Sequence, residues 1–410
     1  MRILLSDASG LTARQAAGQL SGAGHHVAAL SPGWLCLCRF TRHVDKVHRV
    51  PGYGADPLGW LDAALAVYRS GQFDVLLPTQ EQVAVLSHSA GRLREAGVST
   101  AVPPFEALRA VQDKISASGT LRALGVPQPP TAFLRSADEL RALESLPVFI
   151  KIPISTATTG VRRLSSAAEL GPCADELEAA GVFGAGGVIA QEAVSGPLAM
   201  SQSVFANGEM VAAHATLRVR EGAGGGASHK RSLDEPGVVL KHVELLGRAL
   251  HWHGGLSADA VMTDRGPLFI DINPRLVEPG NASRSGVDLV GALMDVARGN
   301  VPAAQPPGRP GVATHQLLLA VLGAAANGHG RRRMTAELAV ALAGSGLYRG
   351  SAEELTPVRR DPRTALPVLL AAAATLVSPS LSGRLVGASV ASYALASSGW
   401  ETLLSTPPVP

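Results

Sequence analysis

The sequence predicts an α/β protein that opens with a parallel-sheet domain and ends in an alanine-rich, mainly helical region. Residues 3–5 and 27–30 are short apolar runs typical of buried strands. Residues 9–24, between them, carry apolar side chains at helical spacing and close with a glycine. This β-α-β order favours a parallel sheet. It lacks the Gly-x-Gly-x-x-Gly fingerprint, so a dinucleotide site is not expected.

Length and composition exclude several classes of protein. A chain of 410 residues is too long for one ordinary core and predicts two or three domains. With 36 Lys and Arg against 33 Asp and Glu, the net charge is +3, which argues against nucleic acid as the main partner. Cys36, Cys38 and Cys173 cannot form a disulfide framework and predict buried thiols in a reducing cytoplasm. The N-terminus reaches Asp7 without a signal peptide's apolar region, so we expect a cytoplasmic protein.

The first predicted domain covers residues 1–108. Its third strand, 74–78, ends in Thr79-Gln80-Glu81, and ligands of open α/β sheets bind at such carboxyl edges. Glu81 is therefore a candidate substrate residue. A helix capped by Thr79 explains the same residues equally well. Beyond Pro103-Pro104 we expect one helix that holds Asp113 and Lys114.

A second domain is predicted over residues 109–302, with strands at 148–152, 187–192, 201–206 and 209–216 followed by a hairpin. The proline content of residues 302–310 predicts a linker, and residues 303–410 form the third, helical part. Residues 365–383 carry no charge, but Pro367 and Pro379 interrupt them. A membrane helix needs roughly 20 apolar residues, so a buried or interface helix is favoured over a membrane span.

The hairpin is the most informative segment. Two apolar runs, 255–262 and 267–275, flank a Thr-Asp-Arg-Gly turn. Strand alternation places Asp271, Asn273 and Arg275 on one face, with Phe269 of the same parity and with Ile270 and Ile272 packed behind. Asp259 can face them from the other strand. Two carboxylates and an amide oxygen suit Mg²⁺, and the arginine suits phosphate groups. The alternative is a polar face that only meets water.

Three further segments have both a chemical and a plain structural interpretation. Lys151 lies in an apolar strand, where its ammonium group needs an anionic partner. The loop after it, 153–160, offers hydroxyl groups and a glycine to phosphate oxygens, or is only a flexible turn. Gln191 could bond an adenine or simply end a strand. Residues 222–228, rich in glycine, together with the basic residues that follow them, could close over a polyphosphate or link two strands.

Taken in this order and spacing, these segments resemble the ATP-grasp superfamily of ATP-dependent carboxylate ligases, and most of all its carbamoyl-phosphate-synthetase-like branch. The resemblance covers residues 1 to about 302. Its most specific part is the acid at 259, the acid twelve residues later and the Asn-Pro-Arg that follows. It implies an N-terminal domain that usually helps to form the substrate site, followed by an ATP-grasp domain of two α+β subdomains.

The resemblance also implies roles for individual residues. ATP phosphates would contact Lys114, Lys151 and the phosphate loop, which includes Ser155, Thr156, Thr158, Thr159 and Gly160. The adenine pocket would include Gln191, Glu192 and Val194. Magnesium would be held by Asp259, Asp271 and Asn273, with Mn²⁺ as a substitute. Arg275 would stabilise the transferring phosphoryl group.

Three features depart from the family pattern. Both usual metal glutamates are aspartates here, which shortens their reach. No acid follows Gly196, where the family often has a ribose-binding glutamate, so Pro197, Leu198 and Ala199 leave that contact unassigned. The C-terminal hundred residues resemble no domain with a known function.

The resemblance implies an ATP-dependent carboxylate-amine ligase that forms an amide or peptide bond through an acyl phosphate, in small-molecule or peptide biosynthesis. Arg218, Lys230 and Arg284 are candidates for binding the substrate carboxylate or the acyl phosphate, with surface arginines as the competing interpretation. We expect small-molecule carboxylate and amine substrates, a homodimer, and neither nucleic acid nor membrane as a partner. One alternative is a biotin-dependent carboxylase, although no Met-Lys pair marks a biotin carrier. Another is a regulatory or scaffold protein that binds ATP without turnover.

Overall fold

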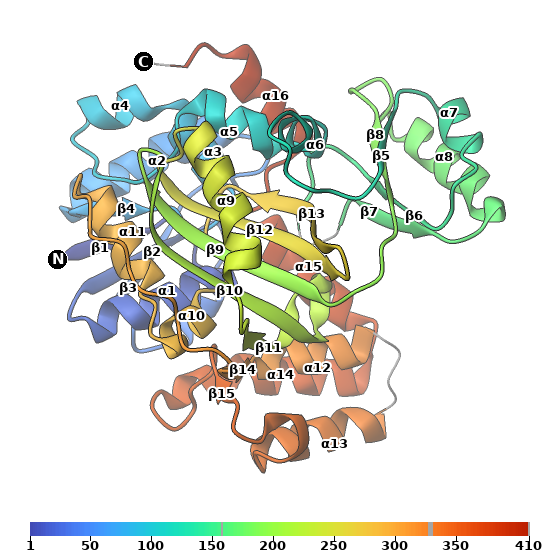
Figure 1. Ribbon diagram of the computed structural model, residues 1–410. Helices are drawn as coiled ribbons and strands as arrows, with labels where there is room; N and C mark the ends of the chain where they lie inside the picture. Colours follow the sequence, from blue (N-terminus) through green and yellow to red (C-terminus); the bar gives the residue numbers. More distant parts are fainter. Residues whose placement is uncertain (157–158, 327–330, 409–410) are drawn as a thin grey trace.

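The computed structural model describes residues 1–410 except 157–158, 327–330 and 409–410. Its strands form one seven-stranded and two four-stranded sheets. In Figure 1 the large sheet lies at the centre, with the N-terminal domain on one side and the smaller green sheet on the other. The C-terminal helices, orange to red, lie mostly along the lower edge. The predicted α/β class with a helical C-terminal region is confirmed.

The N-terminal sheet has the order β3-β2-β1-β4, and each neighbouring pair is parallel. Its strands are β1 (Arg2–Leu5), β2 (His26–Ser31), β3 (Lys46–Arg49) and β4 (Val75–Leu77). The accompanying helices are α1 (Leu11–Gly22), η1 (Leu37–Arg39), α2 (Pro57–Gly71), α3 (Val83–His88) and α4 (Ala90–Glu95). Beyond the carboxyl ends of β1 and β4, the Thr79 amide donates to the Ser6 hydroxyl at 3.0 Å. Thr79 does not cap a helix, because α3 begins only at Val83.

The chain leaves this domain through two helices where the sequence predicted one. These are α5 (Phe105–Gln112) and α6 (Lys114–Ala123). Asp113 between them has an extended backbone, and its carboxylate accepts from the Ser116 amide at 2.7 Å. This N-cap starts a new helix at Lys114.

The smaller sheet is antiparallel in the order β5-β8-β6-β7. Its strands are β5 (Thr131–Leu134), β6 (Val148–Lys151), β7 (Val161–Leu164) and β8 (Val188–Glu192). The sequence predicted β6 and β8 but not the two edge strands. The helices of this unit are α7 (Ala137–Arg141), η2 (Ala167–Glu169) and α8 (Leu170–Ala179).

The large sheet has the order β13-β12-β9-β10-β11-β14-β15 and is antiparallel except for its last pair. Its strands are β9 (Leu198–Ala206), β10 (Glu209–Glu221), β11 (Ala227–Ser232), β12 (Gly254–Thr263), β13 (Gly266–Asn273), β14 (Ala313–His315) and β15 (Ala352–Glu353). A short turn, η3 (Ala223–Gly225), joins β10 to β11. The helices inserted between strands are α9 (Gly237–Ala249), α10 (Gly280–Ser285) and α11 (Leu289–Ala297).

The C-terminal region is helical around the two short strands that it adds to the large sheet. Its helices are α12 (Leu317–Ala326), α13 (Arg331–Leu342), η4 (Gly346–Tyr348), η5 (Pro362–Thr364), α14 (Ala365–Val377), α15 (Leu381–Ala391) and α16 (Ser397–Ser405). Across the described parts of the chain, no helix has the length and apolar character needed to cross a bilayer.

The predicted linker at 302–310 has no helix or strand, but it is fixed to its surroundings. The Gln305 amide donates to the Val211 carbonyl at 2.9 Å, and the Arg309 amide donates to the Ser285 carbonyl at 2.8 Å. It is therefore an ordered connection, not a free tether.

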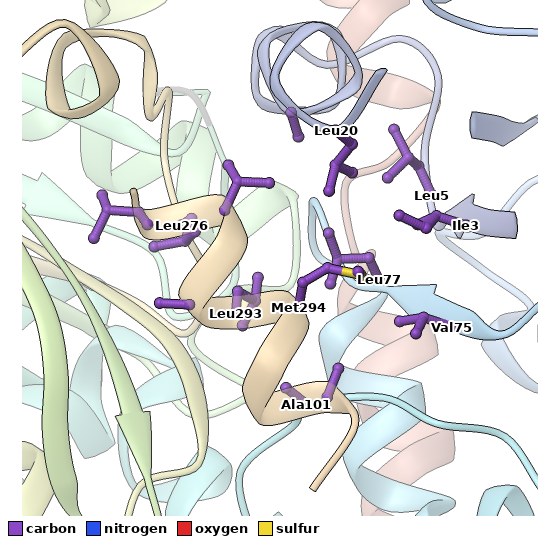
Figure 2. Packing of buried hydrophobic residues seen from close by; sticks show 14 of the residues in the cluster. Ile3, Leu5, Leu20, Val75, Leu77, Ala101, Leu276, Leu293 and Met294 are labelled. Carbon is purple, nitrogen blue, oxygen red and sulfur yellow. The ribbon is translucent and has the colours of Figure 1, made fainter. Parts of the chain in front are cut away.

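One hydrophobic core joins the first domain to the rest of the protein. Ile3, Leu5 and Leu77 of the parallel sheet pack in the same cluster as Leu293 and Met294 of α11. Figure 2 shows these side chains converging between β1, β4 and α11. Because all five are at most 5% exposed, the first domain is held by apolar packing and not only by the chain connection.

Candidate active site

The hairpin of β12 and β13 brings the predicted metal ligands together. Asp259 is the register partner of Asp271, and Ser257 is the partner of Asn273. Ile272 packs behind Asp271 and Asn273 as predicted. The predicted placement of Phe269 on the face of the acids is wrong, because the register shifts between Asp259 and Ala260. Phe269 and Ile272 both lie in the hydrophobic core. The shift separates Phe269 from the face that the acids share.

The two aspartates repel each other. Burial and the charge of Asp271 raise the pKa of Asp259 to about 7. The Lys114 ammonium lies 3.6 Å from a carboxylate oxygen of Asp271. A divalent cation between the two carboxylates would relieve the same repulsion, so the residues fit Mg²⁺. Within the described ranges no group of three or more His, Cys, Asp or Glu gathers as a metal site, and the candidate set is two carboxylates with an amide.

Lys151 is buried and hydrogen-bonded as a cation beside these acids. Its ammonium donates to the Gln191 side-chain oxygen and to the Ile270 carbonyl, both at 2.7 Å. Burial lowers the pKa of Lys151 to about 8, although Asp271 opposes the shift. Among the described residues, Lys151 therefore hydrogen-bonds two neutral oxygens and not the expected anionic group. The third N–H group of its ammonium is left to bind an anion.

The predicted phosphate loop leaves β6 and meets the start of α6. Lys114 donates through its ammonium to the Ser155 carbonyl at 3.2 Å and through its amide to the Pro153 carbonyl at 3.0 Å. The Ser155 hydroxyl is buried and has no partner among the described residues. The Thr159 hydroxyl donates to the Thr156 carbonyl at 2.8 Å. Thr158 lies outside the described residues.

Gly160 closes this loop under a steric constraint. A Cβ at Gly160 would clash with the side chains of Ile152 and Ser155. The Gly160 carbonyl accepts from the Ile152 amide at 3.0 Å. The two ends of the loop therefore lie too close together for any side chain at position 160.

One of the three predicted adenine residues, Gln191, lines a small pocket between α6, β8 and β13. Gln191 and Lys114 are among its lining residues, with Phe269 and Ile270 on the hairpin side. The Gln191 side-chain amide donates to the Thr131 hydroxyl at 3.1 Å, which fixes its orientation. Glu192 and Val194, next along the chain, are half-buried.

Arg275 comes two residues after the end of β13, and its guanidinium contacts the first domain. Its Nε and Nη2 atoms donate to one carboxylate oxygen of Glu81 at 3.0 and 2.8 Å. Gln112 donates to the other Glu81 oxygen at 3.2 Å. Glu81, predicted as a substrate residue, therefore already has protein partners.

Lys230, a predicted catalytic residue, also forms ion pairs within the protein. It is 2% exposed, and its ammonium lies 3.0 Å from carboxylate oxygens of both Glu278 and Glu354. Burial alone would lower the pKa of Lys230, but these two acids hold it above the ordinary value. The basic segment after the glycines is strand β11 of the large sheet, and the glycines before it form the turn η3 between two strands.

The two remaining predicted arginines differ in their surroundings. Arg218 is partly buried, donates to the Gly225 carbonyl at 2.9 Å and lowers the pKa of Asp259, which is mainly raised by burial. Arg284 is exposed on α10, and its side chain has no hydrogen bond or ion pair within the described residues. The structure brings Arg218 to the hairpin but does not bring Arg284 there.

A buried polar network near Lys230 was missed from the sequence. Gln316 bonds both Glu278 and Glu354, and Gln15 of the first domain donates to Glu354 at 3.1 Å. Glu278 has a positive φ of 55°, unusual for a residue other than glycine. Only its place three residues after Arg275 could have pointed to it.

The C-terminal region contributes a tyrosine to the same part of the protein. Two contacts anchor the segment: the Ser389 hydroxyl donates to the Ser9 carbonyl at 3.2 Å, and the Ala396 amide donates to the Gly54 carbonyl at 3.0 Å. Tyr393 lies between these anchors. Burial raises its pKa above the ordinary value. The charged groups that act on its phenol are Arg275, Asp7, Glu81 and Glu278.

No protein-family model matches the sequence, and no curated protein matches it. Solved structures do match. The biotin carboxylase domain of Hydrogenobacter thermophilus 2-oxoglutarate carboxylase, determined with MgADP, ADP and bicarbonate, is 16% identical with a TM-score of 0.61, covering 76% of this chain and 73% of that one.

Two further solved structures have other activities. N5-carboxyaminoimidazole ribonucleotide synthetase from Thermus thermophilus is 19% identical with a TM-score of 0.55, covering 76% of this chain and 81% of that one. An L-amino acid ligase from Bacillus licheniformis is 14% identical with a TM-score of 0.55, covering 73% of this chain and 75% of that one. The fold expected from the sequence resemblance is therefore confirmed.

Proposed function

We propose that this chain, which has the ATP-grasp fold, is an ATP-dependent carboxylate-amine ligase that uses Mg²⁺, or Mn²⁺ in its place. The observation that carries the proposal is the pairing of Asp259 with Asp271 in register, with Lys114 beside Asp271. Two carboxylates held this close repel each other, and a metal ion bound between them, with polyphosphate on its other side, would balance their charge.

The residues divide into a metal side and a phosphate side. Asp259, Asp271 and Asn273 would hold the metal, which neutralises charge on the phosphates when it is bound. Lys114 and Lys151 would contact phosphate oxygens. Such sites act chiefly by positioning and charge neutralisation, because phosphoryl transfer needs little covalent help from the protein.

Arg275 would face the reacting phosphoryl group with its remaining N–H groups. Glu81 holds the guanidinium through Nε and Nη2. An arginine fixed in this way loses little conformational freedom when it binds an anion. Glu81 then acts as a positioning residue for Arg275.

The region around Tyr393, where the substrates would bind, carries more acids than bases, and this favours an amine as one of the substrates. Around Tyr393, three carboxylates, Asp7, Glu81 and Glu278, are opposed by Arg275. Asp7 is buried, and its carboxylate accepts from the Ser9 amide at 3.0 Å. A protonated amine would offer donors and positive charge there. The L-amino acid ligase among the structural neighbours has an activity of this class.

Two alternatives stay open to test. A biotin-dependent carboxylase is favoured by the biotin carboxylase neighbours, and it would hydrolyse ATP in response to bicarbonate. A regulatory protein without turnover would bind ATP but release no ADP with any acid and amine. We also expect a cytoplasmic homodimer. Sedimentation of the purified protein would test the dimer, and fractionation of cells would test the location.

The deciding experiment is an ADP-release screen of carboxylic acids, with and without a pool of amines. An acid that supports turnover should give a hydroxamate with hydroxylamine, because the acyl phosphate is trapped before the amine attacks. Bicarbonate stimulation without hydroxamate would favour the carboxylase. ATP binding without ADP release under any condition would favour the regulatory protein.

A further inference from the structure

Helix α14 has an apolar face that nothing in the described structure covers. Val368, Ala371, Ala372 and Thr375 are buried on one side of the helix, at most 6% exposed. The opposite side consists of Leu366, Leu369, Leu370, Ala373 and Val377, which we name the α14 stripe. Leu369 is 62% exposed and Val377 75%. A helix that is apolar all round normally has a covering partner.

The exposed charges within residues 331–400, which include α14, are of one sign. Residues 331–400 contain eight arginines and no lysine, and each arginine is exposed. They are Arg331, Arg332, Arg333, Arg349, Arg359, Arg360, Arg363 and Arg384. The same residues contain four acids, none exposed, and each contacts a basic side chain inside the protein. These pairs are Glu337 with Arg220, Glu353 with His315, Glu354 with Lys230, and Asp361 with Arg14.

Arginines stand at both ends of the stripe. Arg363 lies in η5, directly before α14. At the other end, the Arg331 guanidinium donates to the Val377 carbonyl at 3.3 Å. Exposed basic groups beside an apolar strip complement an anionic membrane surface, because the arginines can meet the headgroups while the strip meets the acyl chains.

A second copy of the chain fits this surface less well. Whether two α14 helices paired parallel or antiparallel, arginines at the ends of one would face arginines of the other. The described residues 331–400 offer no exposed acid to compensate. Like charges that face each other oppose association, whereas anionic lipid headgroups complement them.

We propose that the α14 stripe docks this protein on an anionic lipid surface. The 13 residues of α14 span about 20 Å at 1.5 Å per residue, which is too short to cross a bilayer but long enough to lie along its surface. The stripe would enter the boundary of the acyl chains while the arginines contact the headgroups. This differs from the expectation of no membrane partner drawn from the sequence, and it does not depend on the proposed ligase activity.

Vesicle sedimentation of the full chain tests the proposal. Vesicles of phosphatidylcholine alone are compared with vesicles of phosphatidylcholine and phosphatidylglycerol, at low and high salt. The protein should bind only the anionic vesicles, and more weakly at high salt. Leu369→Gln with Leu370→Gln should reduce partitioning at least tenfold. Val301→Gln, at another exposed apolar side chain (62%), is the matched control and should bind like the unaltered chain.

Arg359→Gln with Arg360→Gln should also weaken binding, without a change in the thermal unfolding midpoint. Absence of binding to anionic vesicles would overturn the proposal. Equal binding by the Leu369 and Leu370 variant would overturn it too. The protein could instead form a dimer that does not bind vesicles and that dissociates when Leu369 and Leu370 are replaced. That result would overturn the proposal and assign the stripe to a second copy of the chain.

Discussion

Arg275 and Glu81 lie 194 positions apart and meet inside the protein through two hydrogen bonds to one carboxylate oxygen. Their side chains are 7% and 6% exposed. The pair joins the hairpin of β12 and β13 to the carboxyl edge of the parallel sheet. The apolar core shown in Figure 2 joins the same two parts of the chain. The site is therefore built across the boundary between the first domain and the large sheet.

Glu81→Gln should lower both stability and activity. The amide keeps the shape but leaves the Arg275 charge buried without its counterion, which costs about 3 kcal/mol of unfolding free energy. Denaturant titration measures this loss. The control is Glu106→Gln, at an exposed partner of Arg109, which should change stability by about 0.5 kcal/mol or less. Equal stability of the two variants would mean that the buried pair contributes no more than a surface pair.

Asp271→Asn should abolish magnesium-dependent ATP turnover while leaving the fold intact. We expect a fall in ADP release of about 100-fold or more, because a charged ligand is lost from the site. The melting temperature should stay the same or rise, since the repulsion with Asp259 is removed. Asp264→Asn, in the exposed turn of the same hairpin, is the matched control. Near-native turnover by Asp271→Asn would exclude the hairpin as the metal site.

Lys151→Met should weaken ATP binding by about 1.5–3 kcal/mol, the scale of a charge-assisted hydrogen bond. Methionine keeps the apolar stem and removes the ammonium that bonds Gln191 and Ile270. Calorimetry of both proteins measures the difference. Lys241→Met, at an exposed position on α9, controls for loss of a positive charge. Unchanged affinity would make Lys151 a structural residue.

Much of this site could be predicted from local sequence, because its parts lie on short regular segments. Asp259 and Asp271 face each other because a tight turn sets the register of the hairpin. Lys151 and Gln191 meet because β6 and β8 are neighbours in one sheet. Alternation failed only at the bulge near Phe269, since an extra residue in one strand reverses the faces beyond it.

Contacts between distant segments could not be predicted in this way. Lys230 was a candidate for catalysis because its charge follows a glycine-rich segment, but its partners Glu278 and Glu354 come from a loop and from the C-terminal region. Tyr393 reaches the site through anchors at Ser9 and Gly54. No spacing rule connects residues so far apart, because only the tertiary packing brings them together.

Gly323→Ala should destabilise the protein by about 1–3 kcal/mol, because overpacking a close contact forces the backbone to move. A methyl group there would lie 2.8 Å from the Gly222 carbonyl carbon. Gly383→Ala, on α15 with no atom within 4 Å, is the control and should be neutral or stabilising. Thermal unfolding distinguishes them. If Gly323→Ala is tolerated, the turn from Gly222 can move away from α12, as closure of residues 222–228 over a polyphosphate would require.

His229→Phe should stabilise the protein in acid. His229 stacks on His315 with ring centroids 5.4 Å apart, and neither of its ring nitrogens bonds to a described residue. The other groups near this pair are Arg220, Glu337, Tyr348 and Glu353. Burial, with His315 and Arg220, lowers the pKa of His229 from 6.5 to about 4. The unfolded chain therefore takes up more protons between these values, so stability present above pH 6.5 is lost as the pH falls toward 4. The loss is about 2 kcal/mol at pH 5.

Phenylalanine fills the same space without titrating, so denaturant titrations at pH 7 and 5 should show a smaller loss of unfolding free energy for the variant. His26→Phe, at an exposed histidine, should keep the original pH dependence. An identical loss for His229→Phe and the unaltered chain would place the acid sensitivity at other groups.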